Sequence, residues 1–240
     1  MLRIIPNKIH LTRPFRLPLI RPFHIDNSCV LCLLPEIGNK WFDCSRYRNN
    51  GIITEATIKQ GRHGAALWFD GVDDYVDCGN DESLKPLKVV TMELWINLSS
   101  YSNVSANHQF GFLNQCGYSL WQWANNGTPW CWVIKLNDID NTHRKMDLPL
   151  NFIPLNTNTH IVTIIDTENG KLTFYKNGIF FQEGSIPAGD IVYSGNFFIG
   201  EKFKGFVDEV RIYNRALSLE EIRGNMFTSK RYHFMRGWKS

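Results

Sequence analysis

The sequence predicts an all-β domain built as a sandwich of two antiparallel sheets. Short segments rich in Val, Ile, Phe, Tyr and Trp recur along most of the 240 residues, and turn residues separate them. The dipeptides Asn169-Gly170 and Asn177-Gly178 have the composition of two-residue hairpin turns. One short helix is expected near the C-terminus, because Ser218 and Glu221 have the spacing of a capping box.

The expected strands differ in length and in pattern. Residues 29–34 form a continuous apolar run. Residues 88–98 show the alternating pattern of a long strand whose two faces differ. Residues 35–64 and 137–154 are mostly polar and are expected to be irregular. The other expected strands are 65–69, 75–78, 110–113, 118–123, 130–136, 160–166, 171–176, 179–182, 196–199 and 206–213.

Both ends of the chain are basic, whereas its middle is acidic. Residues 1–25 contain five Lys or Arg side chains, residues 227–240 contain four, and neither segment contains Asp or Glu. The remaining 17 basic and 23 acidic side chains give residues 26–226 a net charge of −6. Four prolines disfavour a helix in residues 1–26, which therefore indicate an extended arm. We divide the chain into this arm, a body over 27–226 and a basic aromatic tail.

The arm and the tail are expected to dock on an acidic surface, which is either another protein subunit or the acidic body itself. Nucleic acid is not the expected partner, because the net charge of the body is negative. The expected contacts in the arm are Arg13, Phe15, Arg16, Arg21 and Phe23. Charged residues and prolines interrupt the apolar residues of the arm, so no secretory signal is expected. No apolar run approaches the roughly 18 residues that a membrane span requires.

The six cysteines allow three interpretations. Cys29 and Cys32 have C-x-x-C spacing, but a zinc site would need a second close pair, which the sequence lacks. Both residues lie in the apolar run 29–34, so buried thiols are expected. The alternatives are a disulfide, such as Cys116 with Cys131, and zinc or redox chemistry.

The segments 203–222 (FKGFVDEVRIYNRALSLEEI) and 66–76 (ALWFDGVDDYV) resemble the LamG-like domains of the concanavalin A-like lectin/glucanase superfamily. The first is similar to the closing segment of that family, and the second to an earlier one. Residues 91–96 (TMELWI), 172–178 (LTFYKNG) and 198–200 (FIG) resemble further family segments in the same order. The resemblance extends from about residue 29 to residue 226. It implies a jelly-roll sandwich in which Trp68 and Trp95 serve core packing.

The paired carboxylates of the glucanases in this superfamily, E-x-D-x-x-E on one strand, have no counterpart in the sequence. Glu93 is alone in its strand, and the adjacent Asp208 and Glu209 would point to opposite faces of a regular strand. His160 has no local nucleophile or carboxylate partner and is expected to be structural. We therefore expect no enzymatic activity, and a glycoside hydrolase is only a remote alternative.

A structural calcium ion is the one cofactor that the sequence suggests. Asp70, Asp73, Asp74 and Asp77 lie close together in one predicted turn, and carboxylate oxygens are the ligands that calcium prefers. The family resemblance implies Asp70 and Asp208 as contributors. In the alternative interpretation, Asp73 and Asp74 cap the turn and Asp208 accepts hydrogen bonds from backbone amides.

A tryptophan-rich hairpin is the candidate carbohydrate site. Two pairs of tryptophans recur with a spacing of two, so each pair would share one face of its strand, with an amide in the connecting loop. The same pattern is also typical of core packing. The candidate residues are Trp121, Trp123, Trp130, Trp132 and Asn126.

These observations favour a non-catalytic structural or adhesion protein of a virion or similar assembly, such as a decoration, spike or tail-associated protein. The arm would anchor the body, and the body would bind surface carbohydrate. The expected location is a virion or an extracellular surface, because a virion needs no secretory signal. A freestanding lectin-like module is the alternative hypothesis.

Overall fold

The computed structural model describes residues 25–34, 40–62, 65–101, 109–111, 117–125, 128–136 and 144–236. The arm residues Arg13, Phe15, Arg16, Arg21 and Phe23 lie outside these ranges. The strands are β1 (Cys29–Leu34), β2 (Lys40–Asp43), β3 (Gly51–Thr54), β4 (Thr57–Gln60), β5 (Ala65–Asp70), β6 (Tyr75–Asp77), β7 (Val89–Leu98), β8 (Gln109–Gly111), β9 (Tyr118–Asn125), β10 (Thr128–Leu136), β11 (Arg144–Pro149), β12 (Thr159–Asp166), β13 (Lys171–Lys176), β14 (Ile179–Ser185), β15 (Phe198–Ile199) and β16 (Lys204–Tyr213). The helices are η1 (Glu82–Leu84), η2 (Leu150–Phe152) and α1 (Leu219–Arg236).

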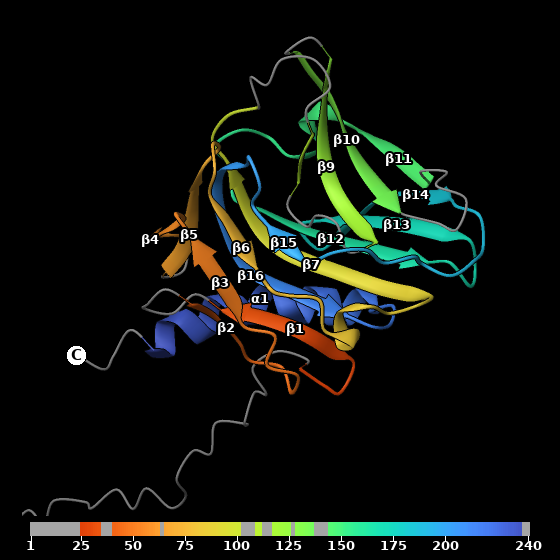
Figure 1. Ribbon diagram of the computed structural model, residues 1–240, viewed down its shortest axis with the longest axis horizontal. Helices are drawn as coiled ribbons and strands as arrows, with labels where there is room; N and C mark the ends of the chain where they lie inside the picture. Colours follow the sequence, from red (N-terminus) through yellow and green to blue (C-terminus); the bar gives the residue numbers. More distant parts are fainter. Residues whose placement is uncertain are drawn as a thin grey trace, which may run out of the picture.

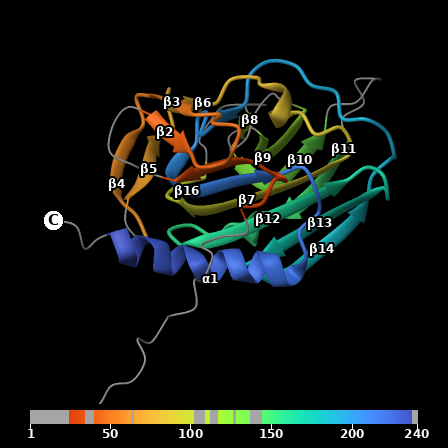
Figure 2. The same ribbon diagram turned by 90° about the horizontal axis from the view of Figure 1, so that it is seen from below.

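The strands form two antiparallel sheets, as the sequence predicts. The larger sheet has the order β14-β13-β12-β7-β16-β1-β2-β3-β6-β15, with β5 paired to β16 and β4 paired to β5. The smaller sheet has the order β11-β10-β9-β8. It lies over one face of the larger sheet, while α1 lies against the opposite face (Figures 1 and 2).

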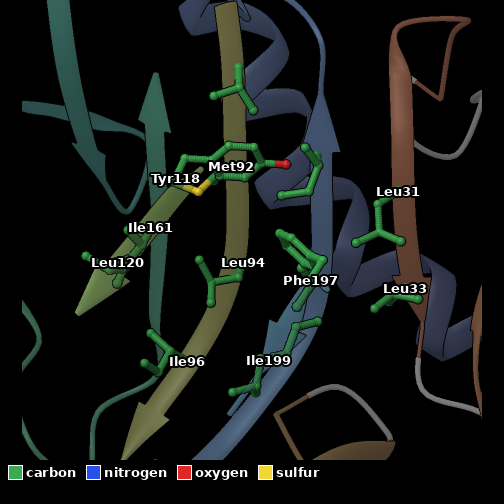
Figure 3. Packing of buried hydrophobic residues seen from close by; sticks show 14 of the residues in the cluster. Leu31, Leu33, Met92, Leu94, Ile96, Tyr118, Leu120, Ile161, Phe197 and Ile199 are labelled. Atoms are coloured by element: carbon green, nitrogen blue, oxygen red, sulfur yellow. The ribbon is translucent and has the colours of Figure 1, made fainter. Parts of the chain in front are cut away.

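The hydrophobic core fills the space between the two sheets. Strand β7 contributes the even-numbered side chains of its alternating pattern, including Met92, Leu94 and Ile96, which face Tyr118 and Leu120 of β9 (Figure 3). This face of the larger sheet is called the inner face below, and the face that carries α1 is called the outer face.

Helix α1 starts where the sequence places it and extends further, to Arg236. Its capping box is formed, since the Ser218 N–H donates to Glu221 Oε2 at 2.8 Å and the Glu221 N–H donates to Ser218 Oγ at 3.3 Å. Ile222 of α1 is fully buried against the outer face, in a small apolar cluster with Val162 and Tyr213. Among the described residues, no helix combines the length and the apolar character needed to cross a membrane.

Four strands lie in the two segments that were expected to be irregular. Strands β2, β3 and β4 fall within residues 35–64, and β11 falls within residues 137–154. Each pairs with a neighbour that the sequence does predict as a strand, β2 with β1, β3 with β6, β4 with β5 and β11 with β10. Pairing with these neighbours therefore forms strands that the polar sequence alone does not indicate.

Candidate ligand-binding site

The outer face of the larger sheet is divided between a covered part and an open part. The odd-numbered residues of β7 point to this face, because the even-numbered ones fill the core. Glu93 is fully buried and accepts a hydrogen bond from Asn225 of α1. Asn97, four residues further along β7 on the same face, lines a pocket instead. The pocket therefore begins on the same strand, beyond the region that α1 covers.

This pocket has a volume of about 210 Å³ and lies over β5, β16 and β7, beside the end of β4 and the residue that precedes β12. The register places Phe206 and Asp208 of β16 opposite Asn97 and Trp95 of β7. Ala66 of β5 contributes only a methyl group, so its small side chain leaves space for the pocket above β5. The other residues that line the pocket are Gln60, Gly61, Arg62, Ile96 and Asn158.

Trp95 and Arg62 form a stack at the centre of the pocket. The Arg62 guanidinium carbon lies 3.8 Å from the centroid of the Trp95 ring, which is within the range of a strong cation–π contact. His160 contacts the Trp95 ring as well, with 5.0 Å between the two centroids. Burial lowers the pKa of Arg62, and the charge of the nearby Glu209 carboxylate opposes that shift. The indole Nε1–H of Trp95 is buried and has no acceptor among the described residues.

Polar groups and a second aromatic pair surround this stack. Asn97 Nδ2 donates to Asn158 Oδ1 at 3.0 Å, which fixes two amide side chains at one edge of the pocket. Trp68 contacts Phe206 edge-on, with 4.7 Å between the centroids, and Lys59 Nζ lies 4.5 Å from the Trp68 ring. The pocket thus combines aromatic surface with amide, guanidinium and carboxylate groups.

A buried ionic network lies between the outer face of the larger sheet and α1, and it contacts the stack through His160. His160 Nε2 lies 2.8 Å from Glu93 Oε1, and Arg211 contacts Glu93 at 3.4 Å and Glu209 at 2.8 Å. Asn225 of α1 donates to Glu93 Oε2 at 2.7 Å. Burial alone would lower the pKa of Arg211, but Glu93 and Glu209 hold it above its ordinary value. His160 is thus a structural residue, as predicted, and it connects this network to Trp95.

The expectation that Asp208 and Glu209 point to opposite faces is wrong. The register between β16 and β7 shifts between Asp208 and Arg211, and Glu209 has φ +51°, so the strand contains a β-bulge. Asp208 lines the pocket on the outer face, and Glu209 binds Arg211 in the network on the same face. Glu209 is 1 % exposed and is held by the arginine, so it is not offered to a ligand as half of an acid–base pair.

The two residues expected to share a calcium ion lie apart. Asp70 pairs with Lys204, and Asp208 is four residues further along β16, at about 13 Å for a rise of 3.3 Å per residue. Carboxylate atoms of Asp70, Asp73 and Asp74 do lie within 4.8 Å of one another. Calcium at this turn, without Asp208, stays a prediction.

The turn is capped by Asp74, which the alternative interpretation named, and by Asp70 in place of the expected Asp73. Asp74 Oδ2 accepts the Asp70 N–H at 2.6 Å, and Asp70 Oδ1 accepts the Val72 N–H at 2.7 Å. Burial raises the pKa of Asp74, and the charges of Asp70 and Asp73 add to that effect.

The tryptophan hairpin is formed in the backbone, with β9 antiparallel to β10. The register pairs Cys131 with Trp123, Val133 with Trp121 and Trp132 with Gln122. The side chains of these four tryptophans lie outside the described part of the structure, as does Asn126. The carbohydrate role of Trp121, Trp123, Trp130, Trp132 and Asn126 therefore stays a prediction.

Cys29 and Cys32 are free thiols and are fully buried beneath α1. A hydrogen bond with Cys32, together with burial, raises the pKa of Cys29, so this thiol stays protonated. Their burial confirms the expectation of buried thiols. Cys116 and the side chain of Cys131, named for a possible disulfide, lie outside the described residues.

Sequence reasoning assigned Trp68 and Trp95 to core packing. Trp95 is buried, at 5 % exposed, as expected, whereas Trp68 is only half-buried. Neither ring belongs to the cluster between the sheets, and both lie on the outer face at or beside the pocket. The available signal was the alternation of residues 89–98, in which Glu93, Trp95 and Asn97 fall on the face opposite to the apolar core positions. Arg62 and Asn158 belong to connecting segments, and no sequence pattern singles them out.

The sequence from residue 70 to residue 223 matches the family model described as the concanavalin A-like lectin/glucanases superfamily. The match covers more than half of the chain, and the chain belongs to this superfamily. No curated protein matches the sequence.

Several solved structures are similar in fold. The binding domain of Paraclostridial Mosquitocidal Protein 1 has a TM-score of 0.69 and 19 % identity over 84 % of this chain and 52 % of that one. The receptor binding domain of botulinum neurotoxin D has a TM-score of 0.64 and 16 % identity over 86 % of this chain and 54 % of its own. For the binding domain of botulinum neurotoxin DC in complex with SialylT, these values are 0.64, 13 %, 85 % and 52 %. The chain spans about half the length of each of these structures.

Proposed function

We propose that this protein is a non-catalytic carbohydrate-binding module and that the pocket around Trp95 holds its ligand. The observation that carries the proposal is the composition of the pocket, in which the Phe206 ring and the Arg62–Trp95 stack meet the amides of Asn97 and Asn158. Proteins bind small ligands in hollows where apolar walls meet a few fixed polar groups. Hydroxyl groups of a sugar pair with amides and carboxylates, and its C–H groups pack on aromatic surface.

The size of the pocket indicates how much of a ligand it would take. A volume of about 210 Å³ is below the roughly 300–1,000 Å³ of pockets that enclose drug-sized molecules. It suits one sugar residue of a longer chain, with the remainder lying on the surface. The similar solved structures include receptor-binding domains and one complex with SialylT, which supports a role in recognition of a surface ligand.

Binding to a glycan array tests this proposal. The Asn97→Ala variant should bind its glycan about tenfold more weakly than the wild type, because it removes one pocket amide and the hydrogen bond that orients Asn158. The matched control is Asn169→Ala, an asparagine in the turn beyond the opposite end of β12. This control should leave the affinity unchanged. An array on which the folded wild-type protein binds no glycan would contradict the proposal.

The assembly role is a further part of the proposal, and the charge distribution supports it. Residues 1–25 carry five basic and no acidic side chains, whereas residues 26–226 carry a net charge of −6. We propose that the arm, 1–26, anchors the body to another subunit of a virion-like assembly. Light scattering of the full chain and of a variant without residues 1–26 should show defined oligomers for the full chain and a monomer for the variant. Two equally well-behaved monomers would contradict it.

A further inference from the structure

We infer that the sugar bound in this pocket carries a carboxylate and that Arg62 binds it, an inference that rests on the proposed function. The geometry of Arg62 carries this step. Its guanidinium lies against the Trp95 ring at 3.8 Å, and Trp95 is 5 % exposed and is backed by His160. The stack fixes the plane of the guanidinium before any ligand arrives, which reduces the entropy that binding would otherwise cost.

The donors of this guanidinium have no acceptor in the described part of the chain. Arg62 makes neither a hydrogen bond nor an ion pair with the described residues. Among these residues, its one cation–π contact is the stack on Trp95. Two other arginines with described burial are buried or half-buried. Arg211 binds Glu93 and Glu209, and Arg215 binds Asp26 and Glu221. Arg62 differs from both, because no carboxylate of the described residues accepts a hydrogen bond from its five N–H groups, although the charge of Glu209 acts on it.

A half-buried guanidinium that has no hydrogen-bond acceptor among the described residues is suited to an anionic ligand. Arginine presents its donors as a planar fork, and a carboxylate is the planar acceptor that this fork binds with two parallel hydrogen bonds. The buried Nε1–H of Trp95 is a further donor in the same wall without an acceptor among the described residues. A neutral sugar would offer the guanidinium only hydroxyl groups, which form weaker hydrogen bonds than a carboxylate does.

The remaining polar groups set the direction of such a ligand. Asp208 also lines the pocket, and its negative charge disfavours a ligand carboxylate on its side. The acid group would therefore lie at Arg62, while Asp208 and the amides of Asn97 and Asn158 would receive hydroxyl groups. One end of the pocket thus selects for charge, and the other end selects for the hydroxyl pattern.

Two matched ligand pairs test this inference by calorimetry or NMR titration. p-Nitrophenyl β-glucuronide and p-nitrophenyl β-glucoside differ only in the carboxylate, and sialyllactose and lactose differ by the acidic sugar. The wild type should bind the acidic member of at least one pair about tenfold or more tightly. Arg62→Gln should reduce this preference to about threefold or less while it retains the affinity for the neutral member. Arg46→Gln, which changes an exposed arginine near Tyr47, should leave both affinities unchanged.

The outcomes separate the two proposals. Equal affinity for the acidic and neutral members, or an acid preference that persists in a folded Arg62→Gln variant, overturns the inference and leaves the carbohydrate site in place. A wild type that binds neither pair, nor any glycan of the array, overturns the proposed function as well. Preference for a sulfated sugar over both carboxylates overturns the carboxylate assignment. If Arg62→Gln fails to fold, Arg62→Lys replaces it, because lysine keeps the charge without the fork and should lose most of the preference.

Discussion

Replacing Arg211 with methionine should lower the free energy of unfolding by about 3–5 kcal/mol, because it leaves two carboxylates buried without their cation. Arg211 and Glu93 are fully buried and Glu209 is 1 % exposed. Neither carboxylate can turn to water, so each would have to stay charged at a high cost or bind a proton. Urea or thermal unfolding, followed by circular dichroism, measures the difference.

Arg215→Met is the matched control, because it also removes an arginine that binds two carboxylates. The Arg215 side chain is 33 % exposed and its partners are Asp26 and Glu221, so solvent screens the pairs and the loss should be below about 1 kcal/mol. A hydrogen bond from Arg215 holds the pKa of Glu221 at about 2. This pKa is depressed in the folded state. The small destabilisation caused by Arg215→Met should therefore have its full size above pH 4.5 and should disappear as the pH falls towards 2. Equal losses for Arg211→Met and Arg215→Met would contradict the role assigned to burial.

The ionic network also connects stability to the binding pocket. Glu93 joins Arg211 to His160, and His160 packs on the Trp95 ring that supports Arg62. A buried ionic group is a costly element when apolar residues could fill the same space. Here the network lies next to the pocket and has a structural role there, because Glu93 fixes the His160 imidazole that packs on the Trp95 indole.

Most of the fold could be predicted because its central strands have strong local patterns. Strands β1 and β13 have the bounds that the sequence predicts, and β7 and β12 differ from prediction by one residue at one end. The four missed strands are short or polar, and β4 (TIKQ) and β11 (RKMDLP) show the reason. Their pairing with β5 and β10 provides hydrogen bonds that no pattern within the segment itself reveals.

The pocket could be predicted only in part, since its residues come together through sheet order. Trp95 and Asn97 are visible in the alternation of β7, but Phe206 and Asp208 reach them only because β16 pairs with β7. A crossover in strand order depends on the whole chain, and a scan of local patterns cannot supply it. The resemblance to the family correctly indicated a buried Trp95, but it did not indicate that this residue also lines a pocket.

Gly200→Ala should lower the free energy of unfolding by about 2–5 kcal/mol. The variant tests how tightly the core packs against the segment 198–200. Gly200 has φ +89°, which a residue with a Cβ adopts at a cost of about 1–2 kcal/mol. A Cβ at this position would lie 2.1 Å from Cε1 of Phe69, a ring that is fully buried. Overpacking of this kind adds about 1–3 kcal/mol, because the surrounding side chains cannot move without leaving their rotamers.

Gly79→Ala separates the two contributions to this loss. Gly79 has φ +74°, but a Cβ there would meet nothing within 4 Å, so only the backbone cost of about 1–2 kcal/mol is expected. Chemical denaturation of both variants and of the double variant Gly200→Ala/Phe69→Leu completes the test. If the Phe69 ring causes the larger loss, the smaller side chain of leucine should recover part of it, and the double variant should be more stable than the sum of the single losses predicts. Equal losses for the two glycine variants, with no coupling to Phe69, would mean that the backbone conformation alone explains why glycine occupies position 200.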